Sequence, residues 1–426
     1  MLGAATALMA GVPLFSTPSY AEEKSLGIPA SMKIFVQDAS TAQIASFVQH
    51  IWQESPLSQE AEAKLNAARA QSEADSKWLY NPVIEFEGED KDGADKTKLI
   101  GVSQTIDWSG KFLAAGEVAK YELQAAAAER DNARQTIAVN VLSALADYQA
   151  AKEILALSSE RTKLMERFSE LAGKRFKAGD IDQSEFNLAQ LAFSEALIQN
   201  ADAETALGDS KMALESSIGF SVNDMSVLPA LSDTLPNIAM SGENVEEVIG
   251  NLPAIRMLQA RGEALRSAIS RARRERIPDP TVSLKGGSSE GDNVIGMSVS
   301  IPLNVFNTYG SEVDVAKYKT TAQQKSLQSV FQSAKSRLMS SQRSYELSAR
   351  AWSVWKKNGA RALEQQIDTL DRKFKVGDLS ATDYLVQVQQ TLDTEIAAKE
   401  LHSKAWKSWF AWLGASGNIE QWLHEK

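Results

Sequence analysis

The residues of this chain with the greatest capacity for chemistry are its carboxylates. Asp and Glu number 55 against 45 Lys and Arg, which gives a formal net charge of -10 at pH 7. Carboxylates can attract cations or act in acid–base catalysis, but an acidic surplus is also a common way to stay soluble. A nucleic-acid partner would favour a basic face, so this charge balance argues against one.

The partners that carboxylates need for catalysis or metal binding are scarce. Cysteine is absent, which excludes disulfides and thiolate metal sites. The three histidines, His50, His402 and His424, are too scattered to form a metal site. We find no Gly-rich phosphate loop, no nucleophile elbow and no cluster of His with carboxylates. We therefore expect no cofactor, no metal centre and no enzymatic activity, with most carboxylates on solvated helix faces.

The N-terminal segment has the features of an export signal. Residues 1–14 form an apolar run, and the small residues Ser19 and Ala21 fit the rule for signal-peptidase cleavage after Ala21. No later stretch reaches the roughly 18 consecutive apolar residues that a transmembrane helix needs. We predict a signal peptide at residues 1–21, and a membrane span, if present, must then be made of strands.

The rest of the chain is an internal duplication. Four pairs of similar segments occur in the same order with nearly constant spacing: 81–82 and 279–280, 101–106 and 296–301, 118–121 and 315–318, 175–181 and 373–379. Such a repeat decides the architecture. We predict a first repeat at 22–220, a linker rich in Ser, Pro, Asn and Asp at 221–244, and a second repeat at 245–426.

Each repeat is predicted to contain a helix, a strand pair, a very long helix, a tight break at a glycine and a shorter return helix. The expected helices are 41–77, 111–174, 183–217, 245–276, 310–373 and 381–413, and the expected strands are 83–88, 99–106, 281–286 and 294–301. By helix rise, 111–174 spans roughly 95 Å, while 183–217 and 245–276 span roughly 50 Å each. One long helix therefore matches two shorter ones, with the linker halfway along as a belt.

The strands alternate between apolar and small or polar residues. This pattern suits a strand with one face in lipid and the other in water, and equally a hairpin packed on a soluble core. Four strands are too few for a closed barrel, and open strand edges are not tolerated in lipid, whereas three copies would supply twelve. Aromatic residues suited to a membrane boundary cluster near the strand ends: Trp78, Tyr80, Trp108, Phe306 and Tyr309. The predicted lipid-facing residues are Ile100, Val102, Ile106, Ile295, Met297, Val299 and Ile301.

The order of these elements resembles the TolC family of outer-membrane factors. Residues 175–181 and 373–379 are similar to its helical-hairpin tips, and residues 299–307 and 103–111 to its strand-to-helix junctions. The resemblance covers nearly the whole mature chain and is greatest to the CzcC-like group that serves heavy-metal pumps. It implies a homotrimer in the outer membrane and periplasm of a Gram-negative bacterium. A twelve-stranded β-barrel would continue into a twelve-helix α-barrel.

The resemblance also assigns functional positions. Family members receive substrate from an inner-membrane pump of the RND type through a periplasmic adaptor that docks at the hairpin tips. The family narrows its periplasmic end with acidic rings, and Asp383 and Glu185 occupy such positions, although Val386 replaces a second acidic position. These two carboxylates can equally be helix N-terminal residues favoured by the helix dipole. The implied docking positions are Ala178, Gly179, Asp180, Val376, Gly377 and Asp378.

Two functional hypotheses of different classes follow. The first is a passive exit duct of a tripartite efflux system, exporting heavy-metal cations or, as alternatives, drugs or secreted proteins. The second is a soluble periplasmic coiled-coil adaptor or scaffold. An adaptor would need a Gly- and Val-rich barrel domain between its helices, and we identify none in the sequence.

Overall fold

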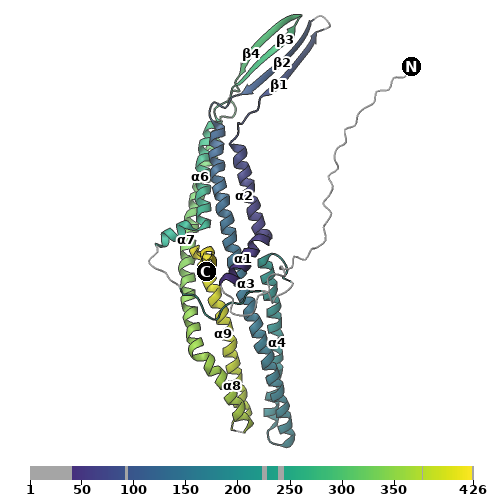
Figure 1. Cartoon of the computed structure of the whole chain (residues 1–426), viewed down its shortest axis with the longest axis vertical. Helices are drawn as coiled ribbons and strands as arrows, with labels where there is room; N and C mark the ends of the chain where they lie inside the picture. Colours follow the sequence, from purple (N-terminus) through teal and green to yellow (C-terminus); the bar gives the residue numbers. More distant parts are fainter. Residues whose placement is uncertain (1–40, 92–94, 223–227, 238–243, 377, 425–426) are drawn as a thin grey trace, which may run out of the picture.

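The computed structural model describes residues 41–91, 95–222, 228–237, 244–376 and 378–424. Figure 1 shows an elongated molecule with a sheet at one end and long helices that run from the sheet to two helical hairpins at the opposite end. The predicted combination of a mainly helical chain with a small β part is confirmed. The predicted signal peptide lies outside the described residues.

The two predicted strand pairs form one antiparallel sheet of order β1-β2-β3-β4. Its strands are longer at the turns than we predict, because pairing continues up to each turn. Between β3 and β4 the turn residues Glu290 and Gly291 have φ of 55° and 91°, the positive values that a tight hairpin requires. The sheet comprises β1 (Val83–Lys91), β2 (Asp95–Thr105), β3 (Thr281–Ser289) and β4 (Asp292–Ser300).

The long helix of the first repeat is confirmed. Helix α3 (Lys111–Ala178) runs unbroken for 68 residues, and α4 (Gln183–Ile218) returns beside it. Gly179 ends α3 with a φ of 82°, and its N–H is donated to the carbonyls of Arg175 and Phe176. A left-handed residue at this position closes a helix without the strain that a side chain would add.

The long helix predicted at 310–373 in the second repeat is also helical throughout, but its geometry changes along its length. Helix α7 (Gly310–Val354) passes through a π-helical turn, η2 (Trp355–Gly359), into α8 (Ala360–Lys375). A Cβ at Gly359 would lie 2.2 Å from Cε3 of Trp355, so the indole occupies the space that only glycine leaves open. After α8 come α9 (Ala381–Ser416) and the short α10 (Ile419–His424).

The helices predicted at 41–77 and 245–276 are each divided in two. The first becomes α1 (Thr41–Glu54) and α2 (Pro56–Asp75), and the second becomes α5 (Val245–Asn251) and α6 (Pro253–Glu275). Each break falls just before a proline, where Ser55 and Leu252 have extended ψ values of 127° and 136°. Proline disfavours the helical conformation of the residue before it and is accepted at the first helical position.

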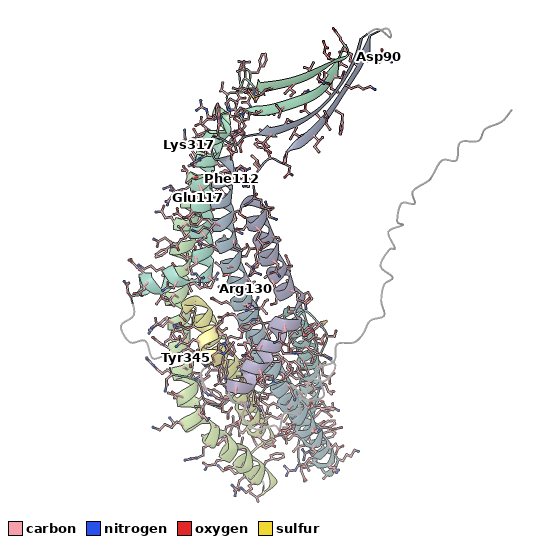
Figure 2. All side chains as sticks on the ribbon, turned by 45° about the horizontal axis from the view of Figure 1, so that its top comes forward. Asp90, Phe112, Glu117, Arg130, Lys317 and Tyr345 are labelled. Atoms are coloured by element: carbon pink, nitrogen blue, oxygen red, sulfur yellow. The ribbon has the colours of Figure 1, made fainter. Side chains whose placement is uncertain are left out.

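The largest apolar core lies in the middle of the molecule, where the described part of segment 221–244 crosses α3, α7 and α9. Val222 and Leu231 are buried there in the same apolar cluster as Leu142, Leu145 and Phe410. Indole N–H groups hold the crossing segment: Trp352 donates to the carbonyl of Asp233 at 2.9 Å, and Trp406 to that of Ser232 at 3.0 Å. Figure 2 labels Tyr345, which also donates from α7 to this segment, at the carbonyl of Pro236.

Candidate functional site

The sheet has one apolar face that is open to the surroundings. The strand register places Ile84, Val102, Leu284 and Met297 in one row across all four strands. The seven residues predicted to face lipid are all at least 42% exposed, up to 84% for Ile295. Five of them lie in strands of the sheet, whereas Ile106 and Ile301 follow directly after β2 and β4. No described segment of the chain covers this face.

The opposite face is polar and internally paired. Lys285 of β3 reaches across β2 to Glu85 and Glu87 of β1, at 3.1 and 3.0 Å. It can do so because Gly101 lies between them, where a Cβ would meet Cγ of Lys285 at 2.7 Å. Ser103 also donates to Glu85, at 2.8 Å. These ion pairs are not predicted from the sequence. The alternation of Glu with apolar residues in β1 could have indicated a charged face that needs a basic partner.

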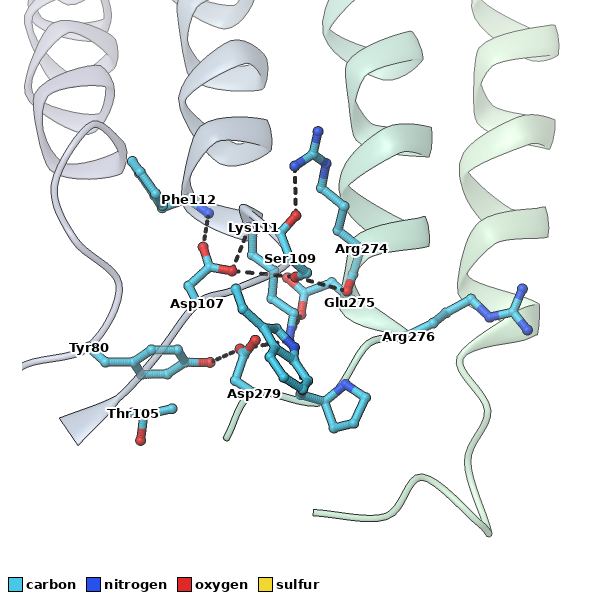
Figure 3. A network of polar contacts seen from close by, with 12 residues as sticks. Tyr80, Thr105, Asp107, Ser109, Lys111, Phe112, Arg274, Glu275, Arg276 and Asp279 are labelled. Carbon is cyan, nitrogen blue, oxygen red and sulfur yellow. Dashed lines mark hydrogen bonds and ion pairs between the residues drawn. The ribbon is translucent and has the colours of Figure 1, made fainter. Parts of the chain in front are cut away.

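A polar network joins the sheet to the helices (Figure 3). Asp107 accepts hydrogen bonds from the backbone N–H groups of Lys111 and Phe112, both at 2.8 Å, at the start of α3. Burial alone would raise the pKa of Asp107, but these backbone donors and the Ser109 hydroxyl lower it below its ordinary value. Arg274 of α6 donates to the carbonyl of Ser109 at 2.7 Å. The first turn of α3 is therefore fixed to α6.

The centre of this network is a buried ion pair. Nζ of Lys111 lies 2.8 Å from Oδ2 of Asp279, and their side chains are only 8% and 4% exposed. Tyr80 donates to the same Oδ2 atom at 2.8 Å, and burial together with this hydrogen bond raises the pKa of Tyr80 to about 12. This ion pair is not predicted from the sequence. The duplication aligns Asp279 with Asn81, but it does not indicate that Asp279 contacts Lys111.

Of the five aromatic residues predicted near the strand ends, two donate hydrogen bonds within the chain, two are strongly exposed, and Tyr309 is the residue before α7. Trp108 is tied down within the chain by a hydrogen bond from its Nε1 to the carbonyl of Pro278, at 2.8 Å, as Tyr80 is by Asp279. Trp78 stacks one face on Phe112 yet remains 80% exposed, and Phe306 is fully exposed. Tyr309, with φ of 54°, directly precedes α7.

The predicted docking residues form the two hairpin tips, which lie at the end opposite to the sheet (Figure 1). Ala178, Gly179, Asp180, Val376 and Asp378 are all exposed, and Gly377 lies outside the described residues. Each tip is closed by a backbone hydrogen bond, from Asp180 to Arg175 and from Asp378 to Lys373, at 2.9 and 3.0 Å. Beneath them a small core contains Phe168, Phe374 and Tyr384.

The two carboxylates predicted to form acidic rings occupy equivalent places in the first turns of α4 and α9. Asp383 accepts from the hydroxyl of Ser380 at 2.7 Å and donates its own N–H back at 3.1 Å. The N–H of Glu185 is donated to Asp182 at 2.8 Å. The capping side chains are those of Asp182 and Ser380, and of the two predicted carboxylates only Asp383 adds a side-chain contact to its cap.

A long cavity of about 1360 Å³ lies between α3, α4, α7 and α9. Its lining combines small residues, mostly Ala and Ser, with longer polar and apolar side chains, and includes Ser143, Ser340 and Ser344. Asp147 on its wall is held by Ser403 and Lys407, at 3.0 and 2.8 Å. The described residues contain no cluster of three or more His or carboxylate side chains suited to a metal ion. None of the described helices is both long enough and apolar enough to cross a membrane.

Comparisons with known proteins extend these observations. Residues 47–220 match the model of a family described as outer membrane efflux protein. The chain is also 23% identical, over 350 residues, to the cobalt-zinc-cadmium resistance protein CzcC of Cupriavidus metallidurans. That alignment covers 80% of this chain and 83% of CzcC.

Solved structures of similar fold are outer-membrane channels. CusC matches with a TM-score of 0.75 and 14% identity, over 94% of this chain and 98% of its own. The open state of the MtrE channel of Neisseria gonorrhoeae matches with a TM-score of 0.73 and 18% identity, over 96% and 98%. The CmeC channel of Campylobacter jejuni has a TM-score of 0.73 and 15% identity, over 97% and 98%. These similarities confirm the predicted fold.

Proposed function

We propose that the chain, which matches the outer membrane efflux protein model through residues 47–220, is a non-enzymatic duct and that three copies of it form one exit channel. The protein resides in the outer membrane and periplasm of a Gram-negative bacterium. In the proposed assembly, three sheets close into a twelve-stranded barrel and the helices below them form a twelve-helix tunnel. Residues 22–220 and 245–426 act as equivalent halves of each copy, and the segment 221–244 forms a belt around the middle.

The observation that carries this proposal is the open apolar face of the sheet. Ile295, Met297 and Phe86 are 84%, 74% and 79% exposed, far more than an isolated soluble domain leaves contiguous. Strands β1 and β4 are the outer strands, so each pairs with one other strand only in the described chain. In a trimeric barrel, lipid would cover the apolar face, and neighbouring copies would pair with the outer strands β1 and β4.

We further propose that the cargo is a heavy-metal cation and that the duct works with an RND-type pump and a periplasmic adaptor. The name of the CzcC relative, a cobalt-zinc-cadmium resistance protein, supports the cargo. The exposed residues Ala178–Asp180, Val376 and Asp378 support adaptor docking, because they lie at the far end from the sheet and no neighbouring atom crowds Gly179. Conduction would be passive, through the lumen that the three copies enclose.

Loss of the gene should sensitise the bacterium to metals. We expect a deletion strain to lose growth at concentrations of cobalt, zinc or cadmium that the parent strain tolerates, and a plasmid copy to restore it. The measurement is the minimal inhibitory concentration of each metal, with a panel of drugs run in parallel. Unchanged metal tolerance with increased drug sensitivity would move the assignment to multidrug efflux.

The acidic ring proposed at the tips predicts an effect on ion flow. Asp383→Asn combined with Glu185→Gln removes both charges and leaves the capping residues Ser380 and Asp182 unchanged. Because carboxylates around a narrow mouth concentrate cations, we expect the double variant to show a smaller cation preference and an altered single-channel conductance in planar bilayers. Glu420→Gln, on α10 and remote from the tips, is the matched control. Identical reversal potentials for the double variant and the wild type would exclude the ring.

A further inference from the structure

In the first repeat, the segment that connects a strand to the long helix packs against a segment of the second repeat. The described part of the single chain contains one contact of this kind. Residues 106–110, between β2 and α3, lie against residues 276–280, between α6 and β3. The contact includes Ile106 N–H donated to the carbonyl of Pro280 at 2.9 Å and Trp108 Nε1 donated to that of Pro278 at 2.8 Å. We call residues 106–110 the connector of the first repeat. We call residues 276–280, which precede β3 in the second repeat, its seat.

The duplication implies a second contact of the same kind that the single chain cannot make. The counterpart of the first connector is residues 301–309, between β4 and α7, and the counterpart of its seat is residues 76–82, between α2 and β1. Strands β4 and β1 are the two outer strands of the sheet, so these segments lie at opposite edges. In a ring of copies, the β4 edge of one copy meets the β1 edge of the next.

Both of these segments carry exposed apolar side chains. Leu303, Val305 and Phe306 are 77%, 69% and 102% exposed, and Trp78 and Leu79 of the opposite segment are 80% and 50% exposed. The connector 301–309 is nevertheless held in place from its own half: Asn304 donates to the carbonyl of Arg276 at 3.0 Å, and Arg276 donates to that of Thr308 at 3.2 Å. The apolar side chains are thus presented on an anchored segment.

The residue types at the contact within the chain differ from those at its counterpart between copies. The contact within the chain is polar at its centre, with Asp279 paired to Lys111. At the counterpart positions the chain has Asn81, and Gly310 begins α7, so the ion pair cannot recur. Burying a charge pair between separately folded copies would cost desolvation at the moment of assembly, whereas apolar surface gains from it.

We propose that the occupant of this surface is a second copy of the chain: Leu303, Val305 and Phe306 of one copy pack on Trp78 and Leu79 of the next, next to the junction of the two sheets. This inference rests on the proposed homotrimer and adds the residues that join its copies. The exposed face of Trp78, whose other face stacks on Phe112, is the platform for the incoming connector.

The test uses the absence of cysteine from the chain. Val305→Cys and Leu79→Cys in one chain, treated with oxidant or a short bis-maleimide in native outer membranes, should convert the monomer band on a denaturing gel into covalent dimer and trimer. Each single variant should remain monomeric. The matched control is Val305→Cys with Leu57→Cys: Leu57 is 53% exposed on α2, the helix that precedes the counterpart seat at residues 76–82, and lies about 30 Å by helix rise from it.

The result can fail in two distinguishable ways. If the protein purifies in detergent as a trimer but the 305/79 pair links no better than the 305/57 control, this contact is overturned while the duct proposal stands. If it purifies as a monomer without detergent, the proposed assembly itself is wrong. Phe306→Ser gives a second readout, because loss of this contact should lower the temperature at which the trimer dissociates, and an unchanged dissociation temperature argues against the contact.

Discussion

Lys111→Met is expected to lower the free energy of unfolding by about 3–5 kcal/mol, because removing one partner of a buried ion pair leaves the other charge unpaired. The remaining Asp279 is 4% exposed on its side chain, and its Oδ1 atom already lacks a hydrogen-bond partner among the described residues. Tyr80 would be its main remaining donor. The junction between sheet and helices should therefore loosen before the rest of the molecule.

The measurement is the unfolding midpoint of the purified protein in detergent, followed by circular dichroism. Lys317→Met is the control: this lysine lies near the start of the equivalent helix in the second repeat and pairs with Asp314 at 2.8 Å on the surface, with both side chains more than half exposed. Such a pair contributes about 0–1 kcal/mol. Equal midpoints for the two variants would show that the Lys111 pair contributes no more than a surface pair.

Ile295→Lys should prevent accumulation of the protein in the outer membrane. Ile295 is 84% exposed at the apolar face of the sheet. A lysine on a lipid-facing strand costs about 2–4 kcal/mol near the middle of the bilayer, and a trimer would incur that cost three times. In a sheet exposed to water, the same change would be harmless or favourable. This variant therefore distinguishes the hypothesis of a membrane duct from that of a soluble scaffold.

The readout is the amount of trimer extracted by detergent from outer-membrane fractions. Ser298→Lys, three residues along β4 and on the polar face, is the matched control and should accumulate normally, because that face looks toward water in the proposed barrel. A folded, soluble Ile295→Lys protein at wild-type yield would contradict the lipid-facing assignment of all seven apolar positions.

Much of the architecture could be predicted from the sequence, because it depends on local patterns. Alternation of apolar and polar residues in the strands, the long helical periodicity and Gly179 at the tip are signals within a few residues of the structure they specify. Prolines 56 and 253 carry an equally local signal for the breaks before α2 and α6, which our helix boundaries overlooked. The π-helical turn at Trp355 had no such signal, since it depends on how one indole packs over Gly359.

The sequence by itself therefore determined the duplication, the element order and which strand residues share a face, since each follows from chain spacing and backbone geometry. Only the tertiary structure decided that β2 pairs with β3, that Lys285 crosses Gly101 to reach Glu85, and that Lys111 is buried beside Asp279. Those partners are separated by more than 160 positions in the chain. These contacts form because the two halves of the chain pack together. The spacing of residues along the chain does not show which residues will come into contact in this way.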